Sequence, residues 1–126
     1  MKPALVYIAG AYRARTPWDV ESNVRAAESM ALCVASMGAV PVCVHSMYRY
    51  FDRADGLSAL YWLEGTLEIM RRCDAVLVLR GRASEESEGT KGEIEEAKRL
   101  GLPIFASPML LSEWLEANYD RFKVLR

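Results

Sequence analysis

The chain is short of the residues from which metal sites are built. Histidine occurs once among its 126 residues, as His45, and Cys33, Cys43 and Cys73 show no CxxC spacing. Zinc sites usually combine several closely spaced cysteines and histidines, so the sequence predicts no metal site, and we expect no cofactor. An odd number of cysteines in or beside apolar segments is typical of reduced thiols in a cytosolic protein, which predicts a cytoplasmic location.

Charge of one sign and long apolar runs are also missing. The formal charge is −1, and the charged residues, 26% of the chain, are mixed in sign, so no basic field for a nucleic-acid polymer is expected. No apolar run approaches the roughly 20 residues that a membrane-spanning helix needs. The apolar start ALVYIAGAY (4–12) follows only one basic residue, Lys2, which favours a buried first strand over a secretory signal. If the protein binds a component of nucleic acids, we expect a monomeric unit such as a nucleoside or nucleotide rather than a polymer.

Apolar residues, 52% of the chain, suffice for one globular domain covering residues 1–126. Their runs predict strands at 4–9, 40–44, 74–79, 104–106 and 122–125. Helical patterns are expected at 19–37, 58–72, 89–100 and 111–119. Asp19 or Ser22 can cap the start of the first of these helices, and Gly38 is placed to end it. This alternation predicts an α/β fold with a doubly wound, mainly parallel five-stranded sheet, a flavodoxin-like or Rossmann-like three-layer sandwich with strand order 2-1-3-4-5.

In a sheet of this order, ligands bind outside the carboxyl ends of the strands, between the first and the third. The loops that meet there are GAYRAR (10–15) and GRASEESEGT (81–90). Gly10 permits a sharp turn after the first strand, Arg13 can hold a phosphate, and Tyr12 can stack on a base. The alternative for Tyr12 and Arg13 is an exposed loop without a ligand.

Residues 87–94 (SEGTKGEI) place a small-residue loop, a helix N-terminus and a carboxylate together after the third strand. Backbone N–H groups in such a turn can hold an anion. Ser87, Gly89 and Thr90 make the loop rich in donors for a phosphate or a sugar hydroxyl, although glycine and serine are common in any strand-to-helix connection.

Glu93 has two interpretations. Helical periodicity places it with Ala97 and Leu100 on the inward face, while Glu95 and Arg99 turn to solvent as an i, i+4 pair. Thr90-x-x-Glu93 also matches a capping box, in which each side chain bonds the other residue's backbone N–H. Glu93 is therefore either a carboxylate in the ligand crevice or a cap of its own helix.

Residues 45–57 show no clear period and predict a long loop, with room for a short helix. His45, after the second strand, is a pocket candidate, although a lone histidine there is more often structural. Asn23 lies close enough to bond a ligand or to cap its helix. Asp74 begins its strand at the end away from the crevice, which favours a strand-entry role. Other aromatic residues can wall a pocket or fill the core: Trp18, Trp62, Tyr48, Tyr50 and Phe51.

Three segments together resemble the nucleoside 2-deoxyribosyltransferase-like superfamily, and in particular its small, often phage-associated members. They are YIAGAYR (7–13), RCDAVLVL (72–79) and SEGTKGEIEEAKRLGLPI (87–104), with looser agreement through PVCVHSMYRYF (41–51). The most specific part of this resemblance is the pattern Ser87-x-Gly89-x-x-x-Glu93. The resemblance implies that Glu93 attacks C1′ of a nucleoside to form a glycosyl-enzyme and that Ser87 and Gly89 hold the 5′ end.

The resemblance implies cleavage of the N-glycosidic bond of a nucleoside or nucleoside 5′-monophosphate, as a hydrolase or a 2-deoxyribosyltransferase. Catalytic members usually carry an aspartate eight residues before the position of Asp74, where it assists departure of the base, and this chain has Thr66. A non-catalytic nucleotide-binding module is therefore the alternative. A phosphoribohydrolase-like enzyme is a further one, although the longer glycine run is missing.

Relatives of this type form homo-oligomers with shared active sites, so the resemblance implies a homodimer or a larger assembly. Trp114, Tyr119 and Phe122 in the C-terminal segment can provide the contact between subunits. Packing within one chain is the simpler account of these aromatic residues. The sequence does not distinguish the base, ribose from deoxyribose, or hydrolysis from transfer.

Overall fold

The apolar runs form the strands of one parallel sheet. The computed structural model describes residues 1–48 and 57–126, and residues 49–56, with Tyr50 and Phe51, lie outside the described part. The strands are β1 (Leu5–Ala9), β2 (Val40–Val42), β3 (Ala75–Val78) and β4 (Ile104–Phe105), in the order β2-β1-β3-β4. All three pairings are parallel, as predicted for an α/β fold.

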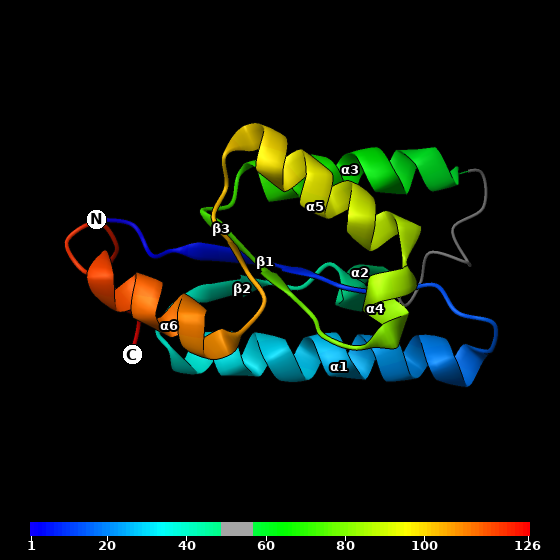
Figure 1. Cartoon of the computed structure of the whole chain (residues 1–126), viewed down its shortest axis with the longest axis horizontal. Helices are drawn as coiled ribbons and strands as arrows, with labels where there is room; N and C mark the ends of the chain where they lie inside the picture. The colour runs from blue at the N-terminus through cyan, green and yellow to red at the C-terminus, as the bar shows by residue number, and fades with distance from the viewer. Residues whose placement is uncertain (49–56) are drawn as a thin grey trace.

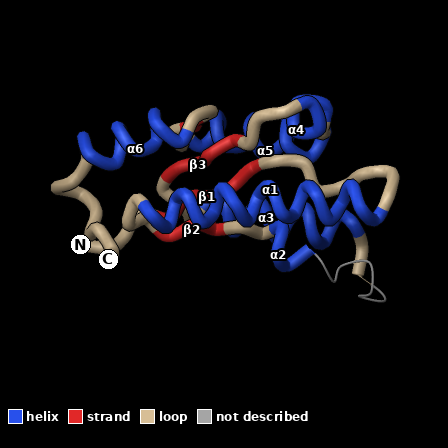
Figure 2. Tube along the Cα trace, turned by 90° about the horizontal axis from the view of Figure 1, so that it is seen from below, coloured by secondary structure: helices blue, strands red, loops and turns tan. Residues whose placement is uncertain are grey.

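Helices cover both faces of this sheet. They are α1 (Pro17–Ser36), α2 (His45–Tyr48), α3 (Ala59–Arg71), α4 (Arg82–Glu86), α5 (Glu88–Leu100) and α6 (Pro108–Ala117). Helices α3 and α5 lie side by side on one face, and α1 and α6 lie on the other (Figures 1 and 2). Both chain termini lie at the end of the sheet opposite to α2 and α4 (Figure 1).

Side chains of β1 alternate between two buried clusters. Val6 and Ile8 belong to the cluster beneath α1 and α6, and Tyr7 and Ala9 belong to the cluster beneath α3 and α5. This period of two follows from the pleat of a strand. Its consequence is that the Tyr7 hydroxyl points toward α5, which carries Glu93.

The expectation of five strands is wrong, since the structure shows four in the described residues. The segment expected at 122–125 makes only an isolated bridge between Phe122 and Lys2, supported by a hydrogen bond of 2.9 Å from Lys123 N to Lys2 O. This segment meets the chain before β1 rather than the free edge of β4. One bridge there is too little to extend the sheet.

Several local boundaries also differ from the sequence prediction. Thr16, not Asp19 or Ser22, caps α1, because Pro17 takes the first helical position and the Thr16 side chain accepts from Asp19 N at 3.1 Å. Gly38 follows the end of this helix with φ +85°. The predicted loop 81–90 contains helix α4, and α2 is the short helix for which the 45–57 loop had room.

Two predicted surface features of the helices need correction. Arg99 pairs with Glu96 at 2.6 Å rather than with Glu95, since residues three apart on a helix are also neighbours. Glu96 is held by Arg71 of α3 as well, at 3.1 Å. Leu100, expected on the inward face, is 36% exposed, since α5 ends there before the left-handed Gly101.

Asp74 has the predicted strand-entry role. Its carboxylate accepts from Leu5 N at 2.8 Å, while Asp74 N donates to Leu5 O at 2.8 Å. These two bonds fasten the start of β3 to the start of β1. The register then aligns Ala9 with Val78 at the other end, where the ends of both strands contribute to one crevice.

The C-terminal aromatic residues pack within the chain. Trp114 lies between Phe105 at 5.6 Å and Phe122 at 5.5 Å, measured between ring centroids. Tyr119 is 73% exposed and takes no part in this cluster. Trp114 and Phe122 therefore pack within one chain, which is the simpler of the two accounts given above. Among the helices that the structure describes, none combines the length and the apolar character that crossing a membrane requires.

Candidate active site

A pocket of about 800 Å³ lies at the carboxyl end of the sheet. Its walls come from the loop after β1, the start of α2, one side of α3, and the segment from α4 into α5. The nine residues predicted from the sequence as site residues all line it: Gly10, Tyr12, Arg13, Asn23, His45, Ser87, Gly89, Thr90 and Glu93. Three sequence segments, near residues 10, 45 and 90, are thus brought together.

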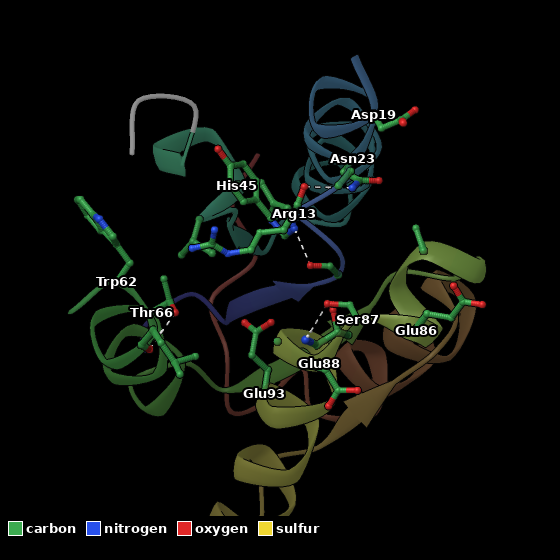
Figure 3. Close-up of a pocket in the computed structure, with 18 of the residues that line it drawn as sticks. Arg13, Asp19, Asn23, His45, Trp62, Thr66, Glu86, Ser87, Glu88 and Glu93 are labelled. Carbon is green, nitrogen blue, oxygen red and sulfur yellow. Dashed lines mark hydrogen bonds between the residues drawn. The ribbon is translucent and has the colours of Figure 1, made fainter. Parts of the chain in front are cut away.

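Glu93 is the buried carboxyl group of this pocket. It is 9% exposed, and its Oε2 accepts a hydrogen bond from the hydroxyl of Tyr7, 86 residues away on β1. Glu93 points from α5 into the space between Thr66 on α3 and Arg13 beyond the end of β1 (Figure 3). The side chain is therefore both anchored to the sheet and open to a ligand.

Burial raises the pKa of Glu93 to about 7, although the hydrogen bond from Tyr7 favours the charged form and opposes part of this rise. Removing a carboxylate from water without a neighbouring cation disfavours ionisation. Protonated and ionised forms of Glu93 therefore coexist near neutral pH. A carboxyl group in this range can act as a nucleophile or take part in proton transfer.

The capping-box interpretation of Glu93 is wrong. Helix α5 begins at Glu88, one turn earlier than that pattern requires, and the side chain of Ser87 caps it by accepting from Thr90 N at 3.2 Å. Thr90 is 2% exposed, and its hydroxyl has no hydrogen-bond partner among the described residues. Capping thus occupies Ser87 and leaves Glu93 on the pocket side.

Three helices hold the backbone that follows β1. His45 Nε2 of α2 lies 2.9 Å from Gly10 O, Ser84 Oγ of α4 accepts from Ala11 N at 3.1 Å, and Asn23 Nδ2 of α1 donates to Tyr12 O at 3.1 Å. These bonds give Asn23 and His45 a positioning role at this loop. The loop that presents Tyr12 and Arg13 is therefore built into the fold.

His45 is buried, at 3% exposure. Because a carbonyl oxygen only accepts, Nε2 carries the proton that is donated to Gly10 O. Burial lowers the pKa of His45, while hydrogen bonds to the backbone at Gly10 and Ala11 and the charge of Glu28 oppose the shift. The ring is expected to be neutral at pH 7.

Gly10 is required by close packing and not by the sharp turn expected from the sequence. Its φ is not positive, since the positive-φ glycines among the described residues are Gly38, Gly81 and Gly101. A Cβ at position 10 would lie 2.3 Å from Leu79 Cδ1 and 2.9 Å from Leu79 Cβ. A side chain at position 10 would therefore collide with the side chain of Leu79, which follows β3.

Helix α3 provides the least polar wall of the pocket. Ala59, Trp62, Leu63 and Thr66 line it from this side. Thr66 Oγ1 donates back to Leu63 O at 3.1 Å, which directs its hydroxyl to its own helix. No carboxylate of α3, neither Glu64 nor Glu68, is among the pocket residues in the described part of the chain.

Charged groups surround the mouth of the pocket. Arg13 and Arg15 are exposed there with Asp19, and Arg13 lies on the His45 side, across from Glu93 (Figure 3). Glu86 and Glu88 on the opposite rim pair with Arg82 at 2.8 Å and Lys91 at 3.4 Å. No cluster of three metal-ligating side chains occurs in the described residues.

Two site residues were missed by sequence reasoning. Tyr7 stands in an apolar run that predicts a buried strand, and a phenol there signals that its hydroxyl needs a partner. Ser84 lies in a segment that the sequence predicts to be a loop, so nothing in the sequence indicates its hydrogen bond to Ala11 N. Trp62 does wall the pocket, whereas Trp18 is 63% exposed and stacks with Arg25 on α1.

Comparison with known proteins bears on the family and the fold. The family model described as Domain of unknown function (DUF7768) matches residues 4–107, which include every predicted site residue. No curated protein matches the chain. A similar solved structure is the 2-deoxyribosyltransferase of the psychrotolerant bacterium Bacillus psychrosaccharolyticus, with a TM-score of 0.60 and 14% identity over 80% of this chain and 69% of that one. This likeness shows a shared fold.

Proposed function

Because this chain belongs to the family described as Domain of unknown function (DUF7768), we propose its function from the pocket itself: cleavage of the N-glycosidic bond of a nucleoside or nucleoside 5′-monophosphate. The observation that carries the proposal is the buried Glu93 carboxyl, held by Tyr7 and facing a pocket of about 800 Å³. The nucleoside-processing enzyme that shares the fold supports it. We also propose that residues 1–126 are one domain of the nucleoside 2-deoxyribosyltransferase-like superfamily.

In the proposed reaction, the ionised Glu93 attacks C1′ on the face opposite to the base. The new bond joins a carboxylate oxygen to C1′, the C1′–N bond breaks, and the base leaves with its electron pair and takes a proton from water. Water, or the nitrogen of an acceptor base, then attacks C1′ and releases the carboxylate. Tyr7 orients the attacking oxygen.

The other pocket residues have supporting roles in this proposal. Ser87 Oγ accepts from Thr90 N, and its hydroxyl proton remains available to a 5′-hydroxyl or a phosphate. Gly89 lies in the first turn of α5, where backbone N–H groups lack partners within the helix. Arg13 supplies a cation at the mouth, and Tyr12 and Trp62 supply rings beside which a base can lie.

The test is release of free base from a panel of ribo- and deoxyribonucleosides and their 5′-monophosphates, followed by chromatography with and without an acceptor base. Glu93→Gln should abolish release. Glu95→Gln, on the exposed side of the same helix, is the matched control and should retain it. Absence of base release from every compound would contradict the proposal.

A nucleotide-binding module without catalysis is the second candidate, and Thr66 favours it. Its hydroxyl is bonded to Leu63 O, where catalytic relatives carry an aspartate that assists base departure. This candidate predicts that a nucleotide raises the melting temperature without turnover. The stabilisation should be lost in Arg13→Ala and Ser87→Ala, and equal stabilisation in both variants would place the ligand elsewhere.

We also propose that the protein forms a homodimer or a larger homo-oligomer, as the resemblance implies. Leu60 and Leu63 near the pocket mouth are 60% and 42% exposed on α3, which supports a contact there, while the C-terminal aromatic cluster is already packed within the chain. Light scattering tests this proposal, and a monomeric mass would contradict it.

A further inference from the structure

Thr90 carries a buried hydroxyl that the protein itself does not use. The residue is 2% exposed, it lines the pocket, and Oγ1 has no hydrogen-bond partner in the described part of the chain. Threonine in a helix usually bonds a carbonyl of the preceding turn or faces water. A buried hydroxyl without a partner is unfavourable and rare in folded proteins. The arrangement calls for a partner from outside the protein.

Two other hydroxyls of the pocket, those of Thr66 and Ser87, have partners within the protein. Thr66 Oγ1 donates to Leu63 O, and Ser87 Oγ accepts from Thr90 N, so both are bonded to backbone. Thr90 could have capped α5 itself, but Ser87 performs that role. Its hydroxyl is therefore used neither for capping nor for another hydrogen bond within the described residues.

The place of Thr90 relative to Glu93 suggests the group that it recognises. Both residues are buried on one face of α5, three positions apart, so their side chains are neighbours. In a β-ribonucleoside, the 2′-hydroxyl projects from the carbon next to C1′, on the face opposite to the base. This is the face that Glu93 would attack, so a hydroxyl beside Glu93 lies close to the 2′-hydroxyl.

Resting on the proposed function, we propose that Thr90 Oγ1 bonds the 2′-hydroxyl and that the substrates are ribonucleosides or ribonucleotides rather than their 2′-deoxy counterparts. A 2′-deoxy sugar would fill the same space and leave the Thr90 hydroxyl buried without a partner. Sites built to bond a substrate hydroxyl discriminate strongly against analogues that lack it. A preference for the ribo form of at least about tenfold in kcat/KM is expected.

The experiment compares each ribonucleoside with its 2′-deoxy analogue in the wild type, Thr90→Val and Thr90→Ser. Valine keeps the shape but removes the hydroxyl, so the ribo preference should fall to within about twofold. Serine restores the hydroxyl and should restore most of the preference. Equal losses for both sugars in Thr90→Val, or a wild type that prefers the deoxy form, would overturn the inference.

Binding to Glu93→Gln separates this inference from the proposed reaction, because that variant lacks the attacking carboxylate. Its thermal stabilisation by the same sugar pairs is measured with and without Thr90→Val. Stronger stabilisation by the ribo form, lost in Thr90→Val, supports the sugar preference even if the wild type cleaves nothing. Cleavage without any ribo preference contradicts the inference alone. No binding of either sugar contradicts both proposals.

Discussion

At the scale of the residue, Glu93 lies in a position that disfavours its charge, while the role proposed for it needs the charge. Burial raises its pKa to about 7, whereas attack on C1′ requires the ionised form. Tyr7 moderates this conflict because its hydroxyl donates to the carboxylate. The pair makes the proposed activity dependent on pH within the neutral range.

The pH dependence of kcat/KM gives the first prediction. The rate should rise from about pH 6 to pH 8, with an apparent pKa of about 7, and should level off above it. The reason is that only ionised Glu93 attacks, and its ionised fraction grows as pH increases through its pKa. Steady-state kinetics on a nucleoside across this range measure it, and a rate independent of pH would contradict it.

Tyr7→Phe should shift the rising limb of that profile to higher pH. The hydrogen bond from Tyr7 lowers the pKa of Glu93 against the effect of burial, so its removal raises the pKa further. Phenylalanine keeps the ring in the core, which limits loss of packing. An unchanged limb with a lower plateau would show that Tyr7 only orients the carboxylate.

At this scale, the sequence predicted the position of a residue correctly where the evidence lay within a single helix or strand. The inward position of Glu93 followed from the helical spacing to Ala97, and both are buried. Its partner Tyr7 was not identified, because that hydrogen bond joins residues 86 positions apart. Ser84 was missed for a related reason, since it contacts Ala11 only once α4 has formed.

At the scale of the element, α3 sets what the pocket can do for the leaving base. Its pocket side is formed by Ala59, Trp62, Leu63 and Thr66, and the Thr66 hydroxyl is directed to its own helix. This wall can make apolar contacts with a ligand, but it carries no acidic side chain. In the proposed reaction, α3 therefore supplies no acid for departure of the base.

Thr66→Asp tests this dependence. An acid at position 66 is expected to accelerate release of poor leaving bases by at least about tenfold, since a positioned general acid typically contributes 10²–10⁴-fold. Thr66→Asn, which matches the shape without the acid, is the control. Base release from a nucleoside measures both, and equal rates in the two variants would show that no acid is needed from α3.

The contact between the ends of β1 and β3 leads to a prediction on stability. Gly10→Ala would place a Cβ 2.3 Å from Leu79 Cδ1, so it should lower the free energy of unfolding by about 1–3 kcal/mol. Urea unfolding measures the loss. In a double-mutant cycle with Leu79→Ala, the two losses should sum to more than the loss in the double variant. Simple additivity would contradict the proposed clash.

Elements themselves were predicted better than their ends. Continuous apolar runs located β1 to β4, and helical patterns located α1, α3, α5 and α6, because these elements bury regular apolar faces. Helix α4 has five residues, too few to produce a period. The fifth strand was wrong because a strand needs a neighbour as well as apolar residues, and Phe122 meets Lys2 rather than β4.

At the scale of the whole molecule, the parallel topology separates the chain termini from the candidate site. Both termini lie at one end of the sheet (Figure 1), while the predicted site residues line the pocket at the other end. The alternation of strands and helices was enough to predict a crevice at the carboxyl ends of the strands. The buried carboxyl of Glu93 in this pocket nevertheless lowers the free energy of unfolding of the entire fold.

Glu93→Gln should therefore stabilise the protein in a pH-dependent way. Below about pH 4.5, Glu93 is protonated in both the folded and the unfolded chain and contributes no difference. Between pH 4.5 and about 7, the unfolded chain ionises this group while the folded chain retains the proton, so the wild type loses stability as pH rises. Above pH 7 the loss reaches its limit of roughly 3 kcal/mol.

Glutamine avoids this loss because it is never charged, and it can still accept a hydrogen bond from Tyr7. The gap in free energy of unfolding between Glu93→Gln and the wild type should be near zero at pH 4 and should widen to pH 8. Urea unfolding at several pH values measures the gap, and Glu95→Gln on the exposed side of α5 controls for a general charge effect. A gap that stays constant with pH would mean that Glu93 ionises as readily in the folded chain as in water, and the proposed nucleophile would then lose its raised pKa.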